Sequence, residues 1–405
     1  MTESLVRSAA TPAATRPSPW AERVALTNFR NYQRAVLNLA PGPVVLTGDN
    51  GAGKTNLLEA VSLLAAGQGL RRAPYPELAR AGGDGGWAVA ARLHASHGTI
   101  EIGTGINAGE AGVNAGRIVR IDQQPQPGSG VLADHVEMVW LTPAMDGLFS
   151  GPAGDRRRFL DRLILCFDPG YRTRVGQFER AMRQRNRLLE LQRGRPSEFD
   201  GLETVMAETG VAIAAARAEA VARMAATIEL GRRAEPGSPF PWARIALDGW
   251  LEDELSQRPA VEVEDVYLRR LQATRDRDRT AGRTLDGPHR CDLLVEHGPK
   301  SMPAKQCSTG EQKALLIGLV LAHAELVAAQ KGGAAPILLL DEIAAHLDER
   351  RRSALFEEIR RLGAQAFMTG TDRSAFASLE QTALFLRVEE GTVLATEWGG
   401  AIGCG

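Results

Sequence analysis

The chain has 405 residues, of which 44% are hydrophobic and 24% are charged, and its formal net charge is −1. These values predict a globular protein with at least one large core and two lobes, and a net charge near zero says little about partners. We find no apolar run long enough to cross a membrane, and no CxxC pair among the four cysteines, which argues against a disulfide framework or a zinc site. We therefore expect a reducing, cytoplasmic compartment and no membrane partner.

The N-terminal part of the chain predicts a disordered extension followed by strands. Residues 1–20 are rich in Ala, Thr, Ser and Pro and lack the continuous apolar core of a secretory signal, so we expect disorder there. Residues 24–32 and 36–39 alternate apolar and polar side chains, which predicts an antiparallel pair of strands. The apolar run at 43–47 then predicts a short buried strand.

A glycine-rich segment with the spacing of a phosphate-binding P-loop follows this strand. It consists of Gly48, Asp49, Asn50, Gly51, Ala52, Gly53, Lys54 and Thr55. A helix is predicted directly after it, at 56–64, so the motif has the flanking elements that it needs. In this setting backbone amides surround a phosphate, Lys54 reaches the terminal phosphates and the Thr55 hydroxyl binds Mg²⁺. The segment predicts a nucleotide-binding protein.

Strands are predicted up to residue 141 and helices after residue 155. The strand-like runs lie at 87–94, 99–106, 117–121 and 136–141. Beyond them the apolar spacing becomes helical, and a Gly-Arg-Pro-Ser break at 194–197 predicts an antiparallel hairpin of helices at 171–193 and 203–231. A short strand at 243–247 and an arginine-rich helix at 266–279 complete this part.

This change of pattern divides the chain. We expect a first lobe segment at 21–150, an inserted helical arm at 151–281 and the rest of the lobe at 282–400. Arginines crowd three segments, 156–162, 180–195 and 269–290. Each segment fits a solvated helix face as well as a track for nucleic-acid phosphates, and both interpretations stay open.

A second candidate anion site opens the apolar helix predicted after residue 308. The segment Ser-Thr-Gly-Glu-Gln contains Ser308, Gly310 and Gln312, and its small residues offer unpaired amides. Ser308 and Glu311 also have the spacing of a capping box, so this stretch alone supports both interpretations equally.

A third motif is an apolar strand at 337–340 that ends in two carboxylates, Asp341 and Glu342. This arrangement places Asp341 beside the P-loop magnesium and Glu342, the catalytic candidate, beside an attacking water. A further parallel strand is predicted at 364–370. The order of these elements implies a doubly wound α/β sheet with nucleotide at its C-terminal edge.

The three motifs resemble those of the SMC class of ATP-binding-cassette (ABC) ATPases, in which residues 308–312 correspond to the signature motif and 344–348 to the D-loop. Within that class the chain resembles the RecF family of bacterial recombination mediators. The segments that carry this second resemblance are 26–32, 48–60, 156–161 and 287–290. The similarity runs from about residue 22 to about residue 395, and RecF proteins carry a short helical arm in place of the long SMC coiled coil.

The resemblance implies a P-loop ABC-type head with a mixed, mainly parallel sheet, and ATP and Mg²⁺ as cofactors. It implies an ATP-dependent homodimer that binds DNA at gaps and single-strand to double-strand junctions. Such proteins hydrolyse ATP slowly and assist RecA loading and SOS induction with RecO and RecR. By position, one subunit binds ATP through its P-loop, and Ser308, Gly310 and Gln312 of the opposite subunit close over the γ-phosphate.

The chain departs from the family pattern at several places. Cys291 stands where an aspartate is usual, and residues 67–72 match only in part, although Arg71 is kept as a candidate phosphate contact. There is no switch histidine of the transporter type, so Thr369 or Thr371 is the candidate for that place. Two other interpretations stay open: an ABC ATPase subunit of a membrane transporter, and an ATP-gated DNA clamp without significant turnover.

Overall fold

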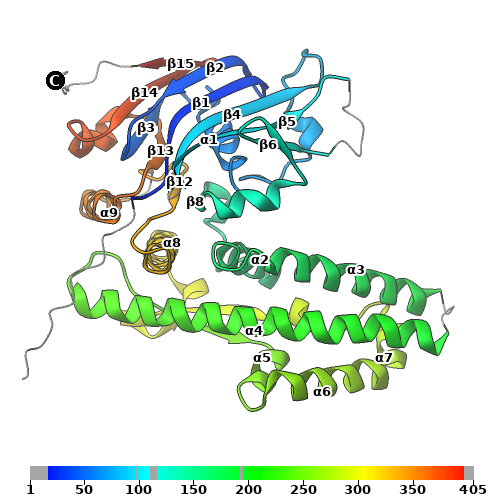
Figure 1. The fold of residues 1–405 in the computed structure, drawn as a ribbon. Coiled ribbons are helices and arrows are strands. Elements are labelled where there is room, and N and C mark those ends of the chain that lie inside the picture. The colour runs from blue at the N-terminus through cyan, green and yellow to red at the C-terminus, as the bar shows by residue number, and fades with distance from the viewer. Residues whose placement is uncertain (1–16, 96–97, 110–115, 192–194, 346, 396–405) are drawn as a thin grey trace, which may run out of the picture.

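Two large sheets lie above a bundle of helices (Figure 1). The computed structural model describes residues 17–95, 98–109, 116–191, 195–345 and 347–395. Residues 1–16 of the predicted N-terminal extension lie outside the described residues. Disorder was predicted as far as residue 20, and at that residue the prediction is wrong. Trp20 already belongs to the first strand and stacks on His94 at a ring distance of 4.3 Å.

The first sheet is antiparallel, with the strand order β2-β1-β4-β5-β6-β7. Its strands are β1 (Trp20–Phe29), β2 (Tyr32–Asn38), β4 (Trp87–Ala95), β5 (Gly98–Ile106), β6 (Ile118–Ile121) and β7 (Gln124–Gln126). The predicted antiparallel pair is confirmed, since Phe29 lies opposite Tyr32 across a two-residue turn. The alternating side chains of β1 and β4 place one apolar face of the sheet in the core.

The second sheet is mainly parallel and has the order β15-β14-β3-β13-β12-β8. Its strands are β3 (Pro43–Thr47), β8 (Met138–Leu141), β12 (Ile337–Leu340), β13 (Ala366–Gly370), β14 (Leu384–Glu389) and β15 (Thr392–Ala395), the last antiparallel to β14. Parallel strands end at the same edge of a sheet. The segments that follow Thr47, Leu340 and Gly370 therefore meet at one edge, as the motif order predicted.

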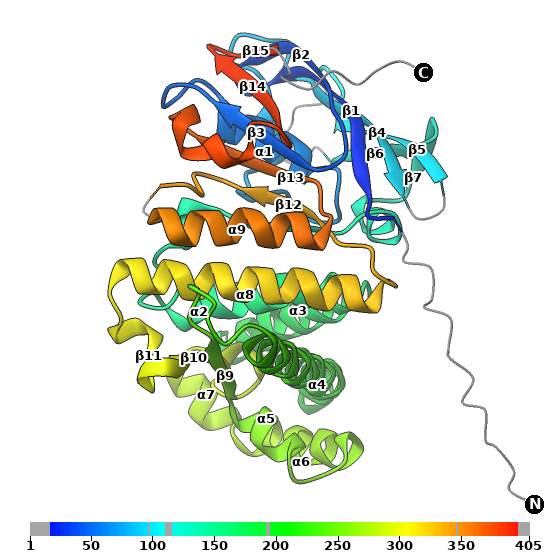
Figure 2. The ribbon, with the colours of Figure 1, turned by 90° about the vertical axis from the view of Figure 1, so that its left-hand side faces the viewer.

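Helices cover both faces of this parallel sheet. Helix α1 (Lys54–Ser62) packs in one hydrophobic cluster with Val44 and Leu46 of β3, on the side of the antiparallel sheet. Helices α8 (Thr309–Gln330) and α9 (Glu349–Leu362) pack in a second cluster with Leu338 and Leu340 of β12, on the opposite side. Figure 2 shows α9 and α8 lying between this sheet and the helices below.

The lower part of the molecule, which we call the arm, has six helices among its described residues and continues the second cluster. They are α2 (Ala153–Ile164), α3 (Tyr171–Glu190), α4 (Pro196–Ala234), α5 (Trp250–Leu255), α6 (Ala260–Ala273) and α7 (Arg275–Ala281). The predicted helical hairpin is confirmed as α3 and α4. The single helix predicted at 266–279 is wrong: it begins earlier and is interrupted at Thr274, whose backbone leaves the helical range at φ −99° and ψ 6°.

A small sheet joins the arm to the chain that follows it. Strand β9 (Ala243–Asp248) pairs with β10 (Asp292–His297), and β10 pairs with β11 (Met302–Pro303). Short 3₁₀ helices complete the described elements at Tyr75–Leu78, Ser129–Asp134, Pro143–Met145, Pro288–Arg290, Gly298–Lys300, Ala304–Gln306 and Arg373–Leu379. Strand β9 precedes residue 282, the limit predicted for the arm, whereas β10 and β11 follow it. The predicted arm and the chain that follows it therefore share a sheet and a core.

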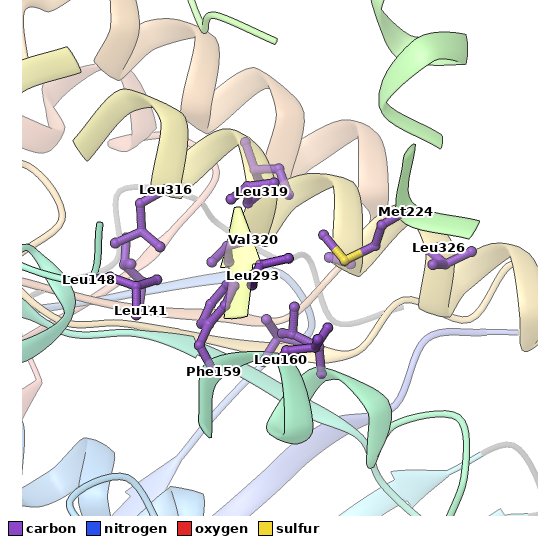
Figure 3. Close-up of a cluster of buried hydrophobic side chains, with 14 of the residues drawn as sticks. Leu141, Leu148, Phe159, Leu160, Met224, Leu293, Leu316, Leu319, Val320 and Leu326 are labelled. Atoms are coloured by element: carbon purple, nitrogen blue, oxygen red, sulfur yellow. The ribbon is translucent and has the colours of Figure 1, made fainter. Parts of the chain in front are cut away.

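Helix α8 is the centre of that core. Figure 3 shows its side chains Leu316, Leu319 and Val320 among Phe159 of α2 and Leu293 of β10. Among the described residues it is the one helix long and apolar enough to cross a membrane, and 78% of its most apolar window is buried inside the protein. The expectation that no apolar run has this length is therefore wrong, and the burial is that of a core helix.

Candidate nucleotide-binding site

The P-loop connects β3 to α1 and takes a backbone path that requires glycine at two of its positions. Gly48 has φ 144°, and a Cβ atom there would lie 2.2 Å from the carbonyl oxygen of Val388 in β14. Gly53 has φ 119°, and its Cβ would lie 2.5 Å from the Asn31 side-chain nitrogen. A side chain at Gly48 would push the loop away from β14, and one at Gly53 would displace the side chains of Asn31 and Tyr32. The predicted glycines thus fix how closely the loop backbone lies against its neighbours.

Lys54 folds back over this loop. Its Nζ donates hydrogen bonds to the carbonyl oxygens of Gly48 at 2.7 Å and Asp49 at 2.8 Å. Burial lowers the pKa of Lys54, while the carboxylates of Glu342, Asp341 and Asp49 act in the opposite direction. The ammonium group is thus held at the loop, close to two acidic side chains that come from another part of the sequence.

The carboxylate of Asp341 binds two hydroxyl groups at the carboxyl edge of the parallel sheet. Thr55 Oγ1 donates to Asp341 Oδ1 at 3.0 Å, and Thr369 Oγ1 donates to the same oxygen at 2.8 Å. Asp341 is 4% exposed. A hydroxyl and a carboxylate are hard oxygen donors of the kind that Mg²⁺ prefers. The two predicted metal ligands, Thr55 and Asp341, are therefore close enough to bind one ion together.

Glu342 is held in an unusual backbone conformation beside this pair. Its φ is 49°, in the left-handed region that few residues other than glycine adopt. Its amide donates to Thr369 Oγ1 at 2.7 Å, so Thr369 fixes both acidic residues at once. Of the two threonines considered for the switch position, Thr369 is the one that these contacts join to Asp341 and Glu342. Strain of this kind is found mainly at functional sites.

The turn between β1 and β2 supports the P-loop from outside. Asn31 Nδ2 donates to the Ala52 carbonyl oxygen at 3.0 Å, and the Tyr32 hydroxyl donates to that of Gly53 at 2.9 Å. The amide of Gly391, in the turn between β14 and β15, also donates to Ala52 at 3.1 Å. Sequence reasoning did not assign these residues to the site. The one signal for two of them was the resemblance of segment 26–32 to the family.

Arg71 lies at the side of α1 within a cluster around Glu59. It donates to Asn56 Oδ1 at 2.8 Å and to Glu59 Oε2 at 3.1 Å, and Glu59 also binds Arg30 through both carboxylate oxygens. Glu59 is 2% exposed, whereas the Arg71 side chain is 41% exposed. Arg71 is therefore anchored to the first helix with its side chain open to solvent. Its contact with a phosphate stays a prediction.

The signature segment forms the start of α8. Ser308 Oγ accepts from the amide of Glu311, and the Glu311 carboxylate accepts from the amide of Ser308 at 3.0 Å, so the capping box is present. Gln312 Nε2 donates to the Cys307 carbonyl oxygen at 2.9 Å, and a Cβ atom at Gly310 would meet nothing within 4 Å. The amides of Thr309 and Gly310 have no acceptor within the helix, since they belong to its first turn.

The P-loop and the signature segment of one chain belong to separate halves of the core. Helix α1 packs in the cluster shared with the antiparallel sheet, whereas α8 packs in the cluster shared with the arm. The polar contacts of Ser308 and Gln312 given above remain within residues 307–311. The structure thus brings the P-loop, Asp341 and Glu342 together, and it places the signature residues on the other side of the sheet.

The sequence matches the family model for the RecF/RecN/SMC N terminal domain over residues 21–393. It is 58% identical over 375 residues to the DNA replication and repair protein RecF of Mesorhizobium japonicum, which covers 93% of this chain and 97% of that protein. It is 54% identical over 371 residues to RecF of Rhizobium etli, with 92% and 97% covered.

The fold is similar to a structure of the recombination mediator protein RecF with ATP, at a TM-score of 0.81 and 21% identity, over 96% of this chain and 100% of that one. It also resembles an Smc head domain from Pyrococcus furiosus bound to the C-terminal domain of ScpA, at a TM-score of 0.52 and 16% identity, over 93% and 96%. These similarities confirm the predicted fold class, an ABC-type α/β head with an inserted helical arm. With the sequence identities, they show that the chain belongs to the RecF family of DNA replication and repair proteins, within the SMC-like ABC ATPases.

Proposed function

We propose that this RecF-family chain is an ATP-driven DNA-binding protein of recombinational repair, whose dimer forms around ATP. The observation that carries the proposal is the contact between Thr55 and Asp341 at 3.0 Å, which joins the P-loop to the end of β12. In this proposal residues 21–150 and 282–400 form the ATPase head and residues 151–281 the arm. The cofactors are ATP and Mg²⁺.

Each residue of the site has a role that follows from its position. The loop from Gly48 to Thr55 surrounds the phosphates with its amides, and Lys54 exchanges its two carbonyl partners for phosphate oxygens. Thr55 and Asp341 hold the metal ion, which when bound neutralises charge on the β- and γ-phosphates. Glu342 orients water, and the Thr369 hydroxyl holds the Asp341 carboxylate and the backbone amide of Glu342 in place.

The signature residues act on a second copy of the chain. Because α8 packs on the far side of the sheet from α1, Ser308, Gly310 and Gln312 are available to the nucleotide of another subunit. The free amides of the first turn of α8 then face its γ-phosphate. ATP binding is coupled to dimer closure, since each nucleotide contacts both chains.

The proposed ligand of the dimer is DNA at gaps and single-strand to double-strand junctions. The structure related in fold comes from the RecFOR pathway, which supports RecO and RecR as partners. Assistance to RecA loading and SOS induction is the outcome that the resemblance to the family implies. We propose slow ATP hydrolysis that is stimulated by DNA and limits the lifetime of the complex. This function places the protein in the cytoplasm, at the nucleoid.

The transporter interpretation is not favoured, because the curated relatives are DNA replication and repair proteins. An ATP-gated DNA clamp without significant turnover differs from our proposal only in that it does not hydrolyse the bound ATP. The strained backbone of Glu342, at φ 49° beside the metal ligands, favours a hydrolytic role for that side chain. Turnover of ATP with and without DNA separates the two.

The first test is the sedimentation mass of the full chain with ATP, with ADP and without nucleotide. We compare the wild type with Lys54→Ala, which removes the phosphate-binding amine, and Ser308→Arg, which blocks the signature segment of the other subunit. A dimer that forms with ATP alone and is absent in both variants is the expected result. A monomer that binds ATP under all conditions would refute the proposed clamp.

A further inference from the structure

The structure separates the arginines that are paired from those that are not. In the segment 269–290, Arg270 pairs with Asp286 at 3.0 Å and Arg275 pairs with Asp200 at 2.6 Å, so part of its charge is neutralised. Other arginines form no ion pair within the described part of the chain. Five of them are Arg72 after α1, Arg162 in α2, and Arg172, Arg180 and Arg187 in α3.

Three of these five lie along one face of α3. Arg172, Arg180 and Arg187 are separated by eight and seven residues, spacings that return to the same side of an α-helix. All three are exposed, whereas Tyr171 and Phe178 on the other side of α3 are buried against the arm. From Arg172 to Arg187 the helix rises by about 22 Å. We call this row the arginine stripe.

A pocket of about 300 Å³ lies at the head end of the stripe. Three guanidinium groups line it, from Arg72 after α1 and from Arg158 and Arg162 in α2, with Asp155 as the one carboxylate among the lining residues. Asp155 pairs with Arg158. Arg162 lies over the Trp140 ring at 4.7 Å, and burial lowers its pKa to about 10, which leaves it charged at neutral pH. The pocket therefore has an excess of positive charge.

The pocket and the stripe adjoin each other. Partial burial, then the charges of Arg158 and Arg172, lower the pKa of Arg72. The carboxylates of Asp161 and Glu179 act in the opposite direction and offset part of this repulsion. Such repulsion between charges falls off with distance, so Arg172, the first residue of the stripe, lies near the pocket. Like charges gathered in this way destabilise the free protein, and an anion placed between them relieves the repulsion.

The backbone of Arg72 is itself strained. Its φ is 55°, a left-handed value that costs a non-glycine residue about 1 kcal/mol. The preceding segment is fixed by two contacts: Arg117 donates to the Gly67 carbonyl oxygen at 2.9 Å, and the amide of Leu70 donates to Ser62 Oγ at 2.7 Å. The loop therefore holds the guanidinium of Arg72 in the pocket at the expense of stability, as functional sites do.

We propose that the pocket and the arginine stripe form one continuous track for the phosphates of a nucleic-acid backbone, in the angle between the head and the arm. The inference rests on the proposed function and names the surface that binds the DNA. A stripe of about 22 Å matches several successive phosphates and is too long for one free phosphate or nucleotide. Guanidinium groups bind phosphate oxygens in pairs and carry no information about the base, so we expect little sequence preference.

The test uses the full chain and a fluorescently labelled gapped duplex, with binding measured by anisotropy in the presence of ATP over a series of salt concentrations. In the triple variant Arg172→Gln, Arg180→Gln and Arg187→Gln, three phosphate contacts are removed. The slope of log affinity against log salt should fall by about 2 to 3, and affinity at 0.1 M salt should fall roughly 100-fold. The matched control replaces three exposed arginines elsewhere that form no ion pair within the described residues by Gln: Arg23, Arg34 and Arg269.

The pocket is tested by Arg72→Asn. Asn tolerates the left-handed backbone, so the melting temperature should not fall, while DNA affinity at 0.1 M salt should fall about fivefold for one lost contact. The variant is also titrated with ATP by calorimetry, where one site per chain is expected in both proteins. Two sites in the wild type that become one in Arg72→Asn would show that the pocket takes a free nucleotide, and would overturn the track.

The outcomes separate the track from the function on which it rests. If the wild type binds DNA and the triple variant keeps the wild-type salt slope, the track is wrong and the proposed function stands. The same conclusion follows if the control variant loses as much slope as the triple variant, because net charge would then explain the effect. If the wild type itself does not bind the gapped duplex with ATP, the proposed function fails first.

Discussion

The arm is held together by a buried arginine, and its replacement is the sharpest test of how the fold is stabilised. Arg185 of α3 is fully buried. It donates to Glu203 of α4 at 2.9 Å, to Asp278 of α7 and the Thr284 hydroxyl at 2.8 Å each, and to the Leu271 carbonyl oxygen at 2.8 Å. One side chain thus links α3 to three other helices, α4, α6 and α7, and to the segment that leads back to the head.

Arg185→Met removes this side chain at nearly constant volume and leaves Glu203 and Asp278 without their central partner. Breaking a buried ion pair by removing one side typically costs about 3–5 kcal/mol. Glu203 keeps Arg275 and Asp278 keeps Arg277, so we expect a loss near the lower limit, about 3 kcal/mol. The neighbouring Arg183, 64% exposed and paired with Glu179, supplies the matched control.

Arg183→Met should cost less than about 1 kcal/mol, because exposed ion pairs contribute little. Both variants and the wild type are unfolded with urea and followed by far-ultraviolet circular dichroism, with midpoints compared at equal slope. Equal midpoints for the two variants would refute the view that Arg185 contributes more to stability because it is buried. A loss of unfolding free energy below about 1 kcal/mol for Arg185→Met would refute it as well.

Three further predictions concern single side chains. Glu342→Gln should lower ATP turnover at least about 100-fold while the ATP-dependent dimer persists in sedimentation, and unchanged turnover would exclude the proposed role. Burial lowers the pKa of His323, whose Nε2 lies 3.0 Å from the Leu163 carbonyl oxygen, to about 4. Between pH 6.5 and 4 the unfolded chain therefore binds more protons than the folded chain, so the free energy of unfolding falls with falling pH, by up to about 3 kcal/mol. In His323→Gln the urea midpoint should depend less on pH across this range. Burial raises the pKa of Cys166 to about 12, so peptide mapping after iodoacetamide at pH 8 should show slow labelling of this thiol in the native chain and fast labelling in urea.

The parts of the site that the sequence predicted are those whose chemistry lies in contiguous residues. The P-loop and the pair Asp341 and Glu342 each occur in one short segment, flanked by a strand or helix that apolar periodicity reveals. Parallel strands ending at one edge then bring the segments together, as the contact of Thr55 with Asp341 shows across 286 positions. The expectation of parallel strands was therefore enough to place the two predicted metal ligands side by side.

The remaining parts depend on contacts that periodicity does not encode. Asn31 and Tyr32 support the P-loop from a turn 21 positions earlier, and nothing in their own segment shows which backbone carbonyls they meet. The same holds for the arginine clusters. Arg275 pairs with Asp200 at a separation of 75 positions, while Arg172 forms no ion pair with any described residue, although both lie in arginine-rich helices. Only the fold decides which arginine stays free.

The position of α8 connects the proposed nucleotide site of the dimer to the arginine stripe. The N-terminus of α8 is the signature segment, and its buried face packs in the same cluster as α2 and α4 of the arm. Arg156 of α2 also binds Asp292 of β10 through both carboxylate oxygens, at 2.8 Å each. A closely packed core moves as a unit rather than deforming locally. A shift of α8 when a second subunit's nucleotide meets Ser308 would therefore be transmitted to the arm, and with it to the row of guanidinium groups on α3.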